Sequence, residues 1–343
     1  MLDDLKYIHQ RDGQDALGIA ERQAGQLEYK YPTLTIDGQF ENVVFAGMGG
    51  SALPALLSRT WPGYKIPFEI CRQYHVPDYV SGKTLFIASS YSGNTEETLS
   101  ALAEAEGRGA AVAVMAGGGK LEEIAVQKGY PMLKLPKAEQ PRYAVFYMLV
   151  AILSILEAAG FQKETDMAAQ LAEAGEFLKQ AVKAWVATVP IADNPAKKLA
   201  IEIAGKSPVV YAGPLLAPAA YKWKISFNEN AKNVAWWNEY PEFNHNEFIG
   251  WSSHPIQKPY SVIDLRSSLE HPRVQKRFEL SDRLLSGKRP AAHVVQAQGK
   301  NILEQLLWTV AYGDFVTIYL ALCNGVNPAP VDLVEKFKAE LDK

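Results

Sequence analysis

Two runs rich in glycine and hydroxyl residues follow short apolar stretches in the first third of the chain, and their residue types suit an anion. The first run is Gly47–Ala52, in which Gly49, Gly50 and Ser51 precede an apolar helical pattern. Glycines let the backbone turn sharply and approach a ligand closely, and a helix start favours an anion through its free N–H groups. A tight strand–helix turn without a ligand is the alternative. The spacing matches neither the dinucleotide fingerprint nor a Walker A loop.

The second run, Ser89–Thr98, places Ser90, Ser92 and Thr95 around one glycine at the end of a predicted strand. Three hydroxyls beside a helix start suit a phosphate monoester, because they donate hydrogen bonds without requiring a metal. Helix capping by Thr95 or Ser92 is the structural alternative, but capping accounts for only one hydroxyl of the three. Two such loops at the strand ends of one open sheet would flank the crevice in which α/β folds usually bind ligands.

Three ionisable residues elsewhere could carry proton transfer and charge stabilisation. Glu229 lies in the segment FNENAKN between Asn228 and Asn230, which can orient its carboxylate. His245 lies in PEFNHNEF, and histidine exchanges protons near neutral pH. Arg142 follows a proline at the start of an apolar helix, and its permanent charge suits a developing anion. The alternatives are a surface glutamate, a structural histidine and a surface ion pair.

Short apolar stretches alternate with helical patterns through most of the chain, which predicts parallel sheets covered on both faces. A valine–valine–aromatic–alanine–glycine run at Val43–Gly47 recurs 166 residues later at Val209–Gly213, which indicates a duplicated domain. The predicted strands are Asn42–Ala46, Thr84–Ser89, Ala110–Met115, Met132–Leu135, Val209–Ala212, Tyr260–Leu265 and His293–Gln296.

These elements predict three parts: an N-terminal helical segment at 1–34, a first α/β domain at 35–162 and a second at 163–343. The apolar stretch Ala144–Phe161 predicts a buried helix rather than a membrane span. The second domain is expected to end in a long helix, Ile302–Cys323, and a short one, Leu333–Leu341. Residues 252–289 are rich in charge, proline and serine, which indicates a surface excursion.

Composition narrows the class of function. The net charge is −3, from 35 basic and 38 acidic residues, so no basic excess favours nucleic acid as a partner. Cys71 and Cys323 form no CxxC pair, so we expect reduced, buried thiols in a cytoplasmic protein and neither a disulfide nor a zinc site. No metal-ligand spacing such as HExxH occurs. The charged N-terminus predicts no signal peptide.

The ordered motifs resemble a known family. Strand–GMGGS followed by strand–SYSGNTEET is similar to the sugar isomerase (SIS) domain, in which hydroxyls of the second loop hold a sugar phosphate. QPR at Gln140–Arg142, FNENAKN at Phe227–Asn233, PEFNHNEFIGW at Pro241–Trp251 and GVNP at Gly325–Pro328 follow in order. Together they resemble the bifunctional phosphoglucose/phosphomannose isomerases, which are built from two SIS domains, from about residue 40 to residue 343.

The resemblance implies two doubly wound, flavodoxin-like domains. It also implies interconversion of glucose 6-phosphate, and of mannose 6-phosphate, with fructose 6-phosphate through a cis-enediol, without metal or other cofactor. Glu229 would be the base, and Arg142 would face the developing charge. His245 would open the sugar ring from the partner subunit of a homodimer, together with Lys338 or the nearby Lys336. The implied substrate and phosphate ligands are Gly49, Gly50, Ser51, Ser90, Ser92 and Thr95.

Other interpretations stay open from the sequence. The phosphate loops do not specify the substituent on the second carbon, so an amino-sugar phosphate isomerase is possible. Some SIS domains only sense sugar phosphates, although Glu229 and His245 argue against a sensor. Val331 stands where the family has a small hydroxyl residue, which leaves the choice between glucose and mannose open. GGGK at Gly117–Lys120 is predicted to be a turn lining the crevice, and the aromatic run Trp236–Phe243 to pack at a subunit interface.

Overall fold

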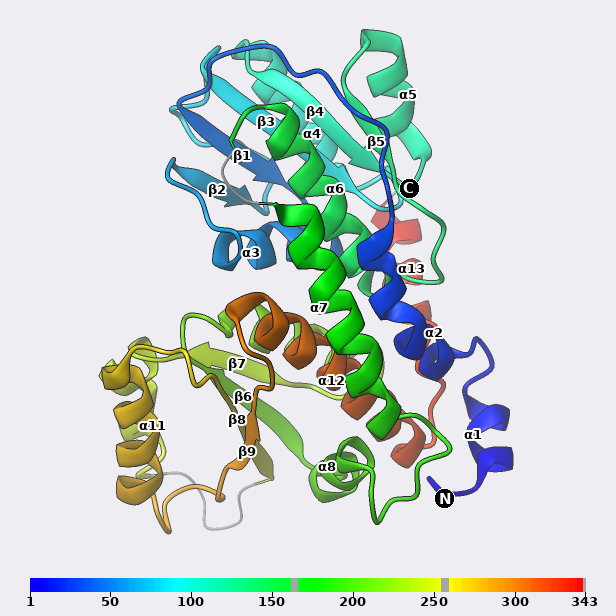
Figure 1. The fold of residues 1–343 in the computed structure, drawn as a ribbon, viewed down its shortest axis with the longest axis vertical. Helices are drawn as coiled ribbons and strands as arrows, with labels where there is room; N and C mark the ends of the chain where they lie inside the picture. Colours follow the sequence, from blue (N-terminus) through cyan, green and yellow to red (C-terminus); the bar gives the residue numbers. More distant parts are fainter. Residues whose placement is uncertain (162–165, 254–258, 342–343) are drawn as a thin grey trace. The chain divides into compact units, whose positions relative to one another are not determined.

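The computed structural model describes residues 1–161, 166–253 and 259–341. Their contacts divide the chain into two compact units (Figure 1). The five-stranded unit contains Gln23–Glu176, and the four-stranded unit contains Met1–Arg22 and Phe177–Lys343. The division falls within helix α7 (Met167–Ala181). The domain limits proposed from the sequence, 1–34, 35–162 and 163–343, differ from these units and stay a prediction.

The described residues of the five-stranded unit form one parallel sheet in the order β2-β1-β3-β4-β5, which is the flavodoxin-like order. The four strands predicted here are confirmed to within a residue at each end. Strand β2 was not predicted, because it is a short edge strand in which only Cys71 is buried. The strands are β1 (Asn42–Ala46), β2 (Phe68–Cys71), β3 (Thr84–Ser90), β4 (Ala111–Ala116) and β5 (Met132–Lys134).

Helices cover both faces of this sheet, which is why its central strands are apolar throughout. Helices α4 (Glu96–Gly107) and α5 (Gly119–Lys128) enclose one hydrophobic core with strand residues such as Phe86 and Val114. Helix α3 (Leu53–Thr60) packs against α6 (Val145–Ala158), and α6 also contacts β4. The expectation of a buried helix at Ala144–Phe161 is confirmed, because most side chains of α6 are buried.

The four-stranded unit repeats this arrangement. Its described strands are all parallel in the order β7-β6-β8-β9, which matches β2-β1-β3-β4 strand for strand. The two valine–valine runs thus become equivalent central strands, which supports the duplication inferred from the sequence. The strands are β6 (Ser207–Ala212), β7 (Trp236–Glu239), β8 (Tyr260–Arg266) and β9 (His293–Gln296).

The two halves of the aromatic run Trp236–Phe243, which the sequence analysis assigned to an interface, lie in different surroundings. Its first half is the edge strand β7, in which Trp236 is half exposed. Tyr240 and Phe243 are instead buried in the core of the unit, beside Tyr211. Within the segment 252–289, for which the sequence indicates a surface excursion, residues 254–258 lie outside the described residues. The described part contains the predicted strand β8 and an unpredicted amphipathic helix, α11 (Pro272–Leu284), few of whose side chains are buried.

Helix α12 (Ile302–Cys323) forms the centre of the four-stranded unit. It packs against α8 (Pro195–Ile203) and α9 (Ala217–Glu229), and its side chains are buried from Leu303 to Leu322. Among the described residues it is the one helix long and apolar enough to cross a membrane, and 89% of its most apolar window is buried. The four-stranded unit also contains the short helix α10 (Glu247–Gly250) and the C-terminal helix α13 (Asp332–Leu341).

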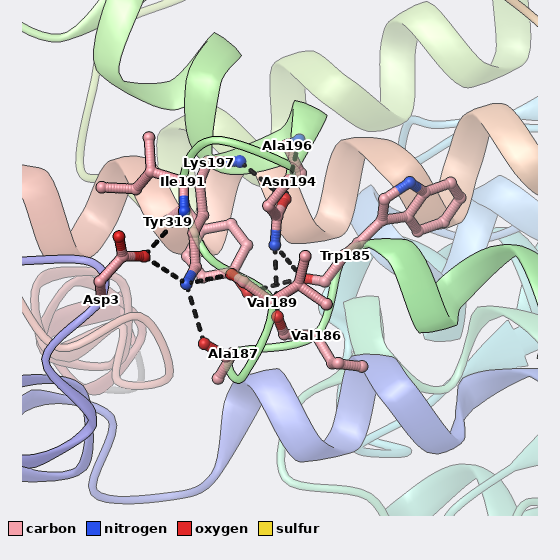
Figure 2. Close-up of polar contacts among 10 residues, drawn as sticks. All are labelled: Asp3, Trp185, Val186, Ala187, Val189, Ile191, Asn194, Ala196, Lys197 and Tyr319. Atoms are coloured by element: carbon pink, nitrogen blue, oxygen red, sulfur yellow. Dashed lines mark hydrogen bonds and ion pairs between the residues drawn. The ribbon is translucent and has the colours of Figure 1, made fainter.

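The N-terminal residues join the four-stranded unit through specific polar contacts. Lys197 of α8 is fully buried, and its Nζ donates to the carbonyls of Ala187 and Val189 and to Asp3 Oδ1 at 2.7–3.1 Å (Figure 2). The same Asp3 oxygen accepts from the backbone N–H of Ile191 at 2.8 Å. Helices α1 (Leu5–Arg11) and α2 (Ala16–Arg22) follow, with α2 packed on α12.

Both cysteines are free thiols, as expected. Cys71 is buried and Cys323 is half-buried, so the expectation of full burial holds for only one of them. Burial raises the pKa of each thiol above its ordinary value, which favours the protonated form of both.

Candidate active site

The loop after β1 is a tight turn, and its glycines allow other backbone segments to approach it closely. Gly49–Ala52 form a 3₁₀ turn, and Gly49 has a φ of +49°. A Cβ atom on Gly50 would lie 3.2 Å from the backbone nitrogen of Arg142. Gly50 therefore packs directly against the segment that carries Arg142, and the two predicted site segments meet here.

Hydroxyl groups join this loop to the loop after β3. Ser51 is buried, and its Oγ accepts from the backbone N–H of Tyr91 at 3.1 Å. Ser89 Oγ donates to the carbonyl of Ser51 at 3.2 Å. Both loops follow parallel strands that pair directly, so they share the carboxyl edge of the sheet, where ligands of this fold class bind.

The second loop leaves the start of helix α4 without a side-chain cap. Thr95 occupies the N-cap position, yet its side chain makes no capping hydrogen bond. Its Oγ1 instead lies 2.8 Å from Ser90 Oγ. Ser92 is exposed, and its Oγ accepts from the N–H of Asn94 at 3.3 Å. The capping alternative therefore fails for Thr95. The first-turn N–H groups of a 12-residue helix stand beside three hydroxyls, which suits an oxyanion.

The glycine-rich turn at Gly117–Lys120 packs against this loop. Gly93 has a φ of +74°, and a Cβ atom there would lie 1.6 Å from the carbonyl oxygen of Gly118. The N–H groups of Gly117 and Leu121 donate to the carbonyls of Tyr91 and Gly93 at 3.0 and 2.9 Å. The turn therefore supports the hydroxyl loop directly.

Gly93→Ala is expected to distort the loop and destabilise the protein. An alanine in the left-handed backbone conformation lowers the free energy of unfolding by about 1–2 kcal/mol. The new methyl group would also collide with a backbone oxygen, and this overpacking should lower it by a further ~1–3 kcal/mol. Gly109→Ala is the matched control, because Gly109 also has a positive φ but has open space around it. Urea unfolding of both variants measures the difference. Equal losses of stability would contradict the packing of Gly93 on Gly118.

Arg142 is almost fully buried, with 1% of its surface exposed. It lies in the 3₁₀ turn Pro141–Tyr143, directly before α6, and its guanidinium lies 4.6 Å from the ring centre of Tyr143. A buried guanidinium next to the Gly50 turn is a fixed positive charge in a region of reduced water access, where it acts on an anion more strongly than at the surface.

Glu229 is the last residue of α9 and is half-buried. Hydrogen bonds hold the backbone on both sides of it. Asn230 Nδ2 donates to Thr317 Oγ1 of α12 at 2.9 Å, and Asn228 Nδ2 donates to the carbonyl of Asn233 at 2.9 Å. The two asparagines thus fix the turn that carries Glu229.

His245 ends the 3₁₀ turn Glu242–His245 and is exposed. Its neighbour Asn244 anchors the turn, because its amide donates to Ser281 Oγ and its oxygen accepts from Arg277, both at 3.1 Å. His245 is therefore an exposed side chain on a turn that is anchored to α11.

Glu247, two residues further on, was missed from the sequence. Its two carboxylate oxygens accept from Tyr211 Oη and from Asn238 Nδ2. Burial and the Glu247 carboxylate raise the pKa of Tyr211, so that phenol remains a hydrogen-bond donor. The only available signal was the second acidic residue in PEFNHNEF, and it does not distinguish a scaffold carboxylate from a surface one.

Lys338 lies on α13, whose described side chains are not buried. Its Nζ contacts Glu335 Oε1 at 2.8 Å, and 58% of its side chain is exposed. Lys336 is exposed on the same helix. Val331 is half-buried, and its carbonyl accepts from Val334 N–H at 2.8 Å to begin the helix. The choice between the two lysines remains a prediction.

The predicted residues thus fall into two sets. The five-stranded unit contains the set Gly49, Gly50, Ser51, Ser90, Ser92, Thr95 and Arg142. The four-stranded unit contains Glu229, His245 and Lys338 on three separate elements. Two cavities of about 490 Å³ lie elsewhere, one lined by Arg266 and Gln305 and one by Arg59 and Phe68. Within the described ranges no group of three acidic, histidine or cysteine residues could hold a metal.

Comparison with known proteins agrees with these motifs. Residues 192–341 match the family model described as "Bacterial phospho-glucose isomerase C-terminal SIS domain". A bifunctional phosphoglucose/phosphomannose isomerase of Aquifex aeolicus is 33% identical, covering 89% of this chain and 91% of its own. One from Thermoplasma acidophilum is 32% identical with the same coverage. A D-glucosamine-6-phosphate 4-epimerase of Sulfolobus acidocaldarius is 33% identical over 65% of this chain and 70% of its own.

Solved structures share the fold. A "glucose-6-phosphate isomerase like protein" of Thermus thermophilus has a TM-score of 0.66 at 19% identity, with 98% of both chains covered. Tagatose-6-phosphate ketose/aldose isomerase of Escherichia coli has a TM-score of 0.63 at 17% identity, covering 94% of this chain and 91% of its own. On the sequence identity and coverage of its relatives, the chain belongs to the bifunctional phosphoglucose/phosphomannose isomerase family.

Proposed function

We propose that this protein interconverts glucose 6-phosphate and mannose 6-phosphate with fructose 6-phosphate. The observation that carries the proposal is the uncapped start of α4, with the hydroxyls of Ser90, Ser92 and Thr95 beside it. Such a start binds a phosphate monoester through N–H and O–H donors. Family membership supports hexose 6-phosphates as the substrates, since the relatives are named as phosphoglucose and phosphomannose isomerases.

The reaction moves one proton between two carbons and one between two oxygens, and it consumes no redox equivalent. In the aldose-to-ketose direction, Glu229 removes the proton from the second carbon. The released electron pair forms the double bond between the first two carbons, and the carbonyl electrons move to the first oxygen. After the hydroxyl proton of the second oxygen passes to the first, Glu229 returns its proton to the first carbon. Arg142 stabilises the enediolate, and His245 and Lys338 assist ring opening.

We further propose a homodimer in which His245 serves the active site of the partner subunit. The exposure of His245 on an anchored turn supports this arrangement, as does the exposed aromatic Trp236 in the same unit. Two free thiols, one buried and one half-buried, are in keeping with a cytoplasmic enzyme.

Mixing two inactive variants tests the shared site. Glu229→Gln and His245→Ala subunits, unfolded together and refolded, should regain activity of up to about a quarter of the wild-type rate, because mixed dimers contain one intact site. Each variant refolded alone is the control. A mixture that stays as inactive as its components would exclude donation of His245 between subunits.

The activity itself is tested by coupled assays of the purified protein with each hexose 6-phosphate. Glucosamine 6-phosphate is the decisive additional substrate, because one relative is named as an epimerase of that compound. Turnover of glucosamine 6-phosphate alone would favour the amino-sugar interpretation. Binding of sugar phosphates without turnover of any would favour a sensor.

A further inference from the structure

Lys232 has an unusual backbone conformation next to the proposed base. Its φ is +53°, and Asp15 is the one other described non-glycine residue with a positive φ. The Asp15 carboxylate accepts from the nearby N–H of Gly18, a local bond that lets aspartate adopt this region. Lysine lacks the short polar side chain that forms such a bond, so an outlier here calls for a reason elsewhere in the structure.

The lysine ammonium group supplies that reason. Its Nζ donates to the carbonyl of Glu229 at 2.8 Å and to that of Asn327 at 2.7 Å. Longer contacts reach the carbonyls of Asn230 at 3.3 Å and Pro328 at 3.2 Å. The carbonyls of Glu229 and Asn230 belong to the C-terminal end of α9, where a cation is favoured. The other two belong to the segment that leads into α13.

A second set of contacts joins the same two segments. Asn324 Nδ2 donates to the carbonyl of Ala231 at 3.0 Å and to Asn233 Oδ1 at 3.2 Å. The motifs FNENAKN and GVNP, about 95 residues apart in the sequence, are therefore held together within the four-stranded unit. Of the two side chains that join these motifs, Lys232 is the one whose ammonium group contacts the carbonyl of Glu229 itself.

We propose that Lys232 is a positioning residue for the isomerisation, which fixes the backbone of Glu229 and ties it to the segment that presents Lys338. This inference rests on the proposed function, in which Glu229 is the base. A base displaced by about 1 Å can lose on the order of 100-fold in rate. The positive φ is maintained because it aims the ammonium group at both segments.

A lysine that merely caps α9 would have a different signature. Lys232→Gly removes the ammonium group but suits a positive φ, so relief at the backbone should offset part of the stability lost with the four carbonyl contacts, and the variant is expected to stay folded. With the cap alone lost, its kcat would stay unchanged. With positioning lost, kcat should fall about 10–100-fold while KM for the hexose 6-phosphate changes less than about threefold.

The experiment compares Lys232→Gly, Lys232→Arg and a control, Lys206→Ala, with the wild type. The ammonium group of Lys206 also donates to a helix carbonyl, that of Glu202. Lys206→Ala keeps the Lys206 backbone carbonyl that accepts from Asn233 Nδ2, so this variant should keep the wild-type kcat. The guanidinium of Lys232→Arg can donate to the same carbonyls, so it should restore most of the activity. A kcat for Lys232→Gly within about twofold of the wild type would overturn the proposal.

Amide hydrogen exchange tests the tie without any catalysis. In Lys232→Gly the amides of 327–341 should exchange faster than in the wild type, because the segment loses its anchor. Unchanged exchange in that range would overturn the tie. A wild-type protein that turns over no hexose 6-phosphate would refute the proposed function alone, and the exchange result would still decide whether Lys232 holds the two segments.

Discussion

Glu229→Gln is expected to lower kcat for hexose 6-phosphates by about 10³-fold or more. The amide has nearly the shape of the carboxylate but cannot accept the proton from the second carbon, and general-base catalysis contributes most of this factor. The side chain lies half-buried at the end of α9, on a turn fixed by Asn228 and Asn230. The fold and the phosphate affinity should therefore be retained.

Two readouts make this prediction sharp. Coupled turnover assays give kcat and KM, and NMR in deuterated water follows exchange of the transferred proton with solvent, which the variant should no longer catalyse. Glu202→Gln is the matched control, because Glu202 is an exposed glutamate of α8 paired with His293. Turnover by Glu229→Gln at the control rate would remove Glu229 from the role of base.

Asp314→Ala is expected to destabilise the protein by about 3–5 kcal/mol. Asp314 and Lys222 are both 1% exposed and form an ion pair between α12 and α9, and Ser226 Oγ donates to the same carboxylate at 3.0 Å. Removing the carboxylate leaves the lysine charge buried without its partner, and an uncompensated buried charge is far more costly than a lost surface pair. Denaturant unfolding measures the loss.

Two further variants separate the buried charge from the deleted side chain. The double variant Lys222→Met with Asp314→Leu should recover most of the stability, because apolar residues of similar volume can replace a buried pair. Glu279→Ala, which breaks an exposed pair with Lys276, should change stability little. An Asp314→Ala variant as stable as Glu279→Ala would show that the pair does not hold α9 against α12.

Most strands and the residue types of the loops could be predicted from local sequence patterns. Buried parallel strands need continuous apolar residues, and a strand–helix turn at a ligand needs glycines and hydroxyls, so β1, β3 and their loops were predicted close to their observed limits. The edge strands β2 and β7 were not, because an edge strand with mixed exposure lacks that continuous pattern. The charged helix α11 was missed for a similar reason: few of its side chains are buried.

The sequence by itself determined the central strands, the repeated half and the residue types at the ends of those strands, since each of these depends on neighbours along the chain. Only the tertiary structure decided that Thr95, at the N-cap position of α4, makes no capping hydrogen bond and pairs with Ser90 instead. It also decided that Asp3 reaches Lys197 and that Lys232 reaches Asn327. Such contacts join segments about 95 to 194 residues apart, and they form only because packing of the helices around each sheet brings those segments together.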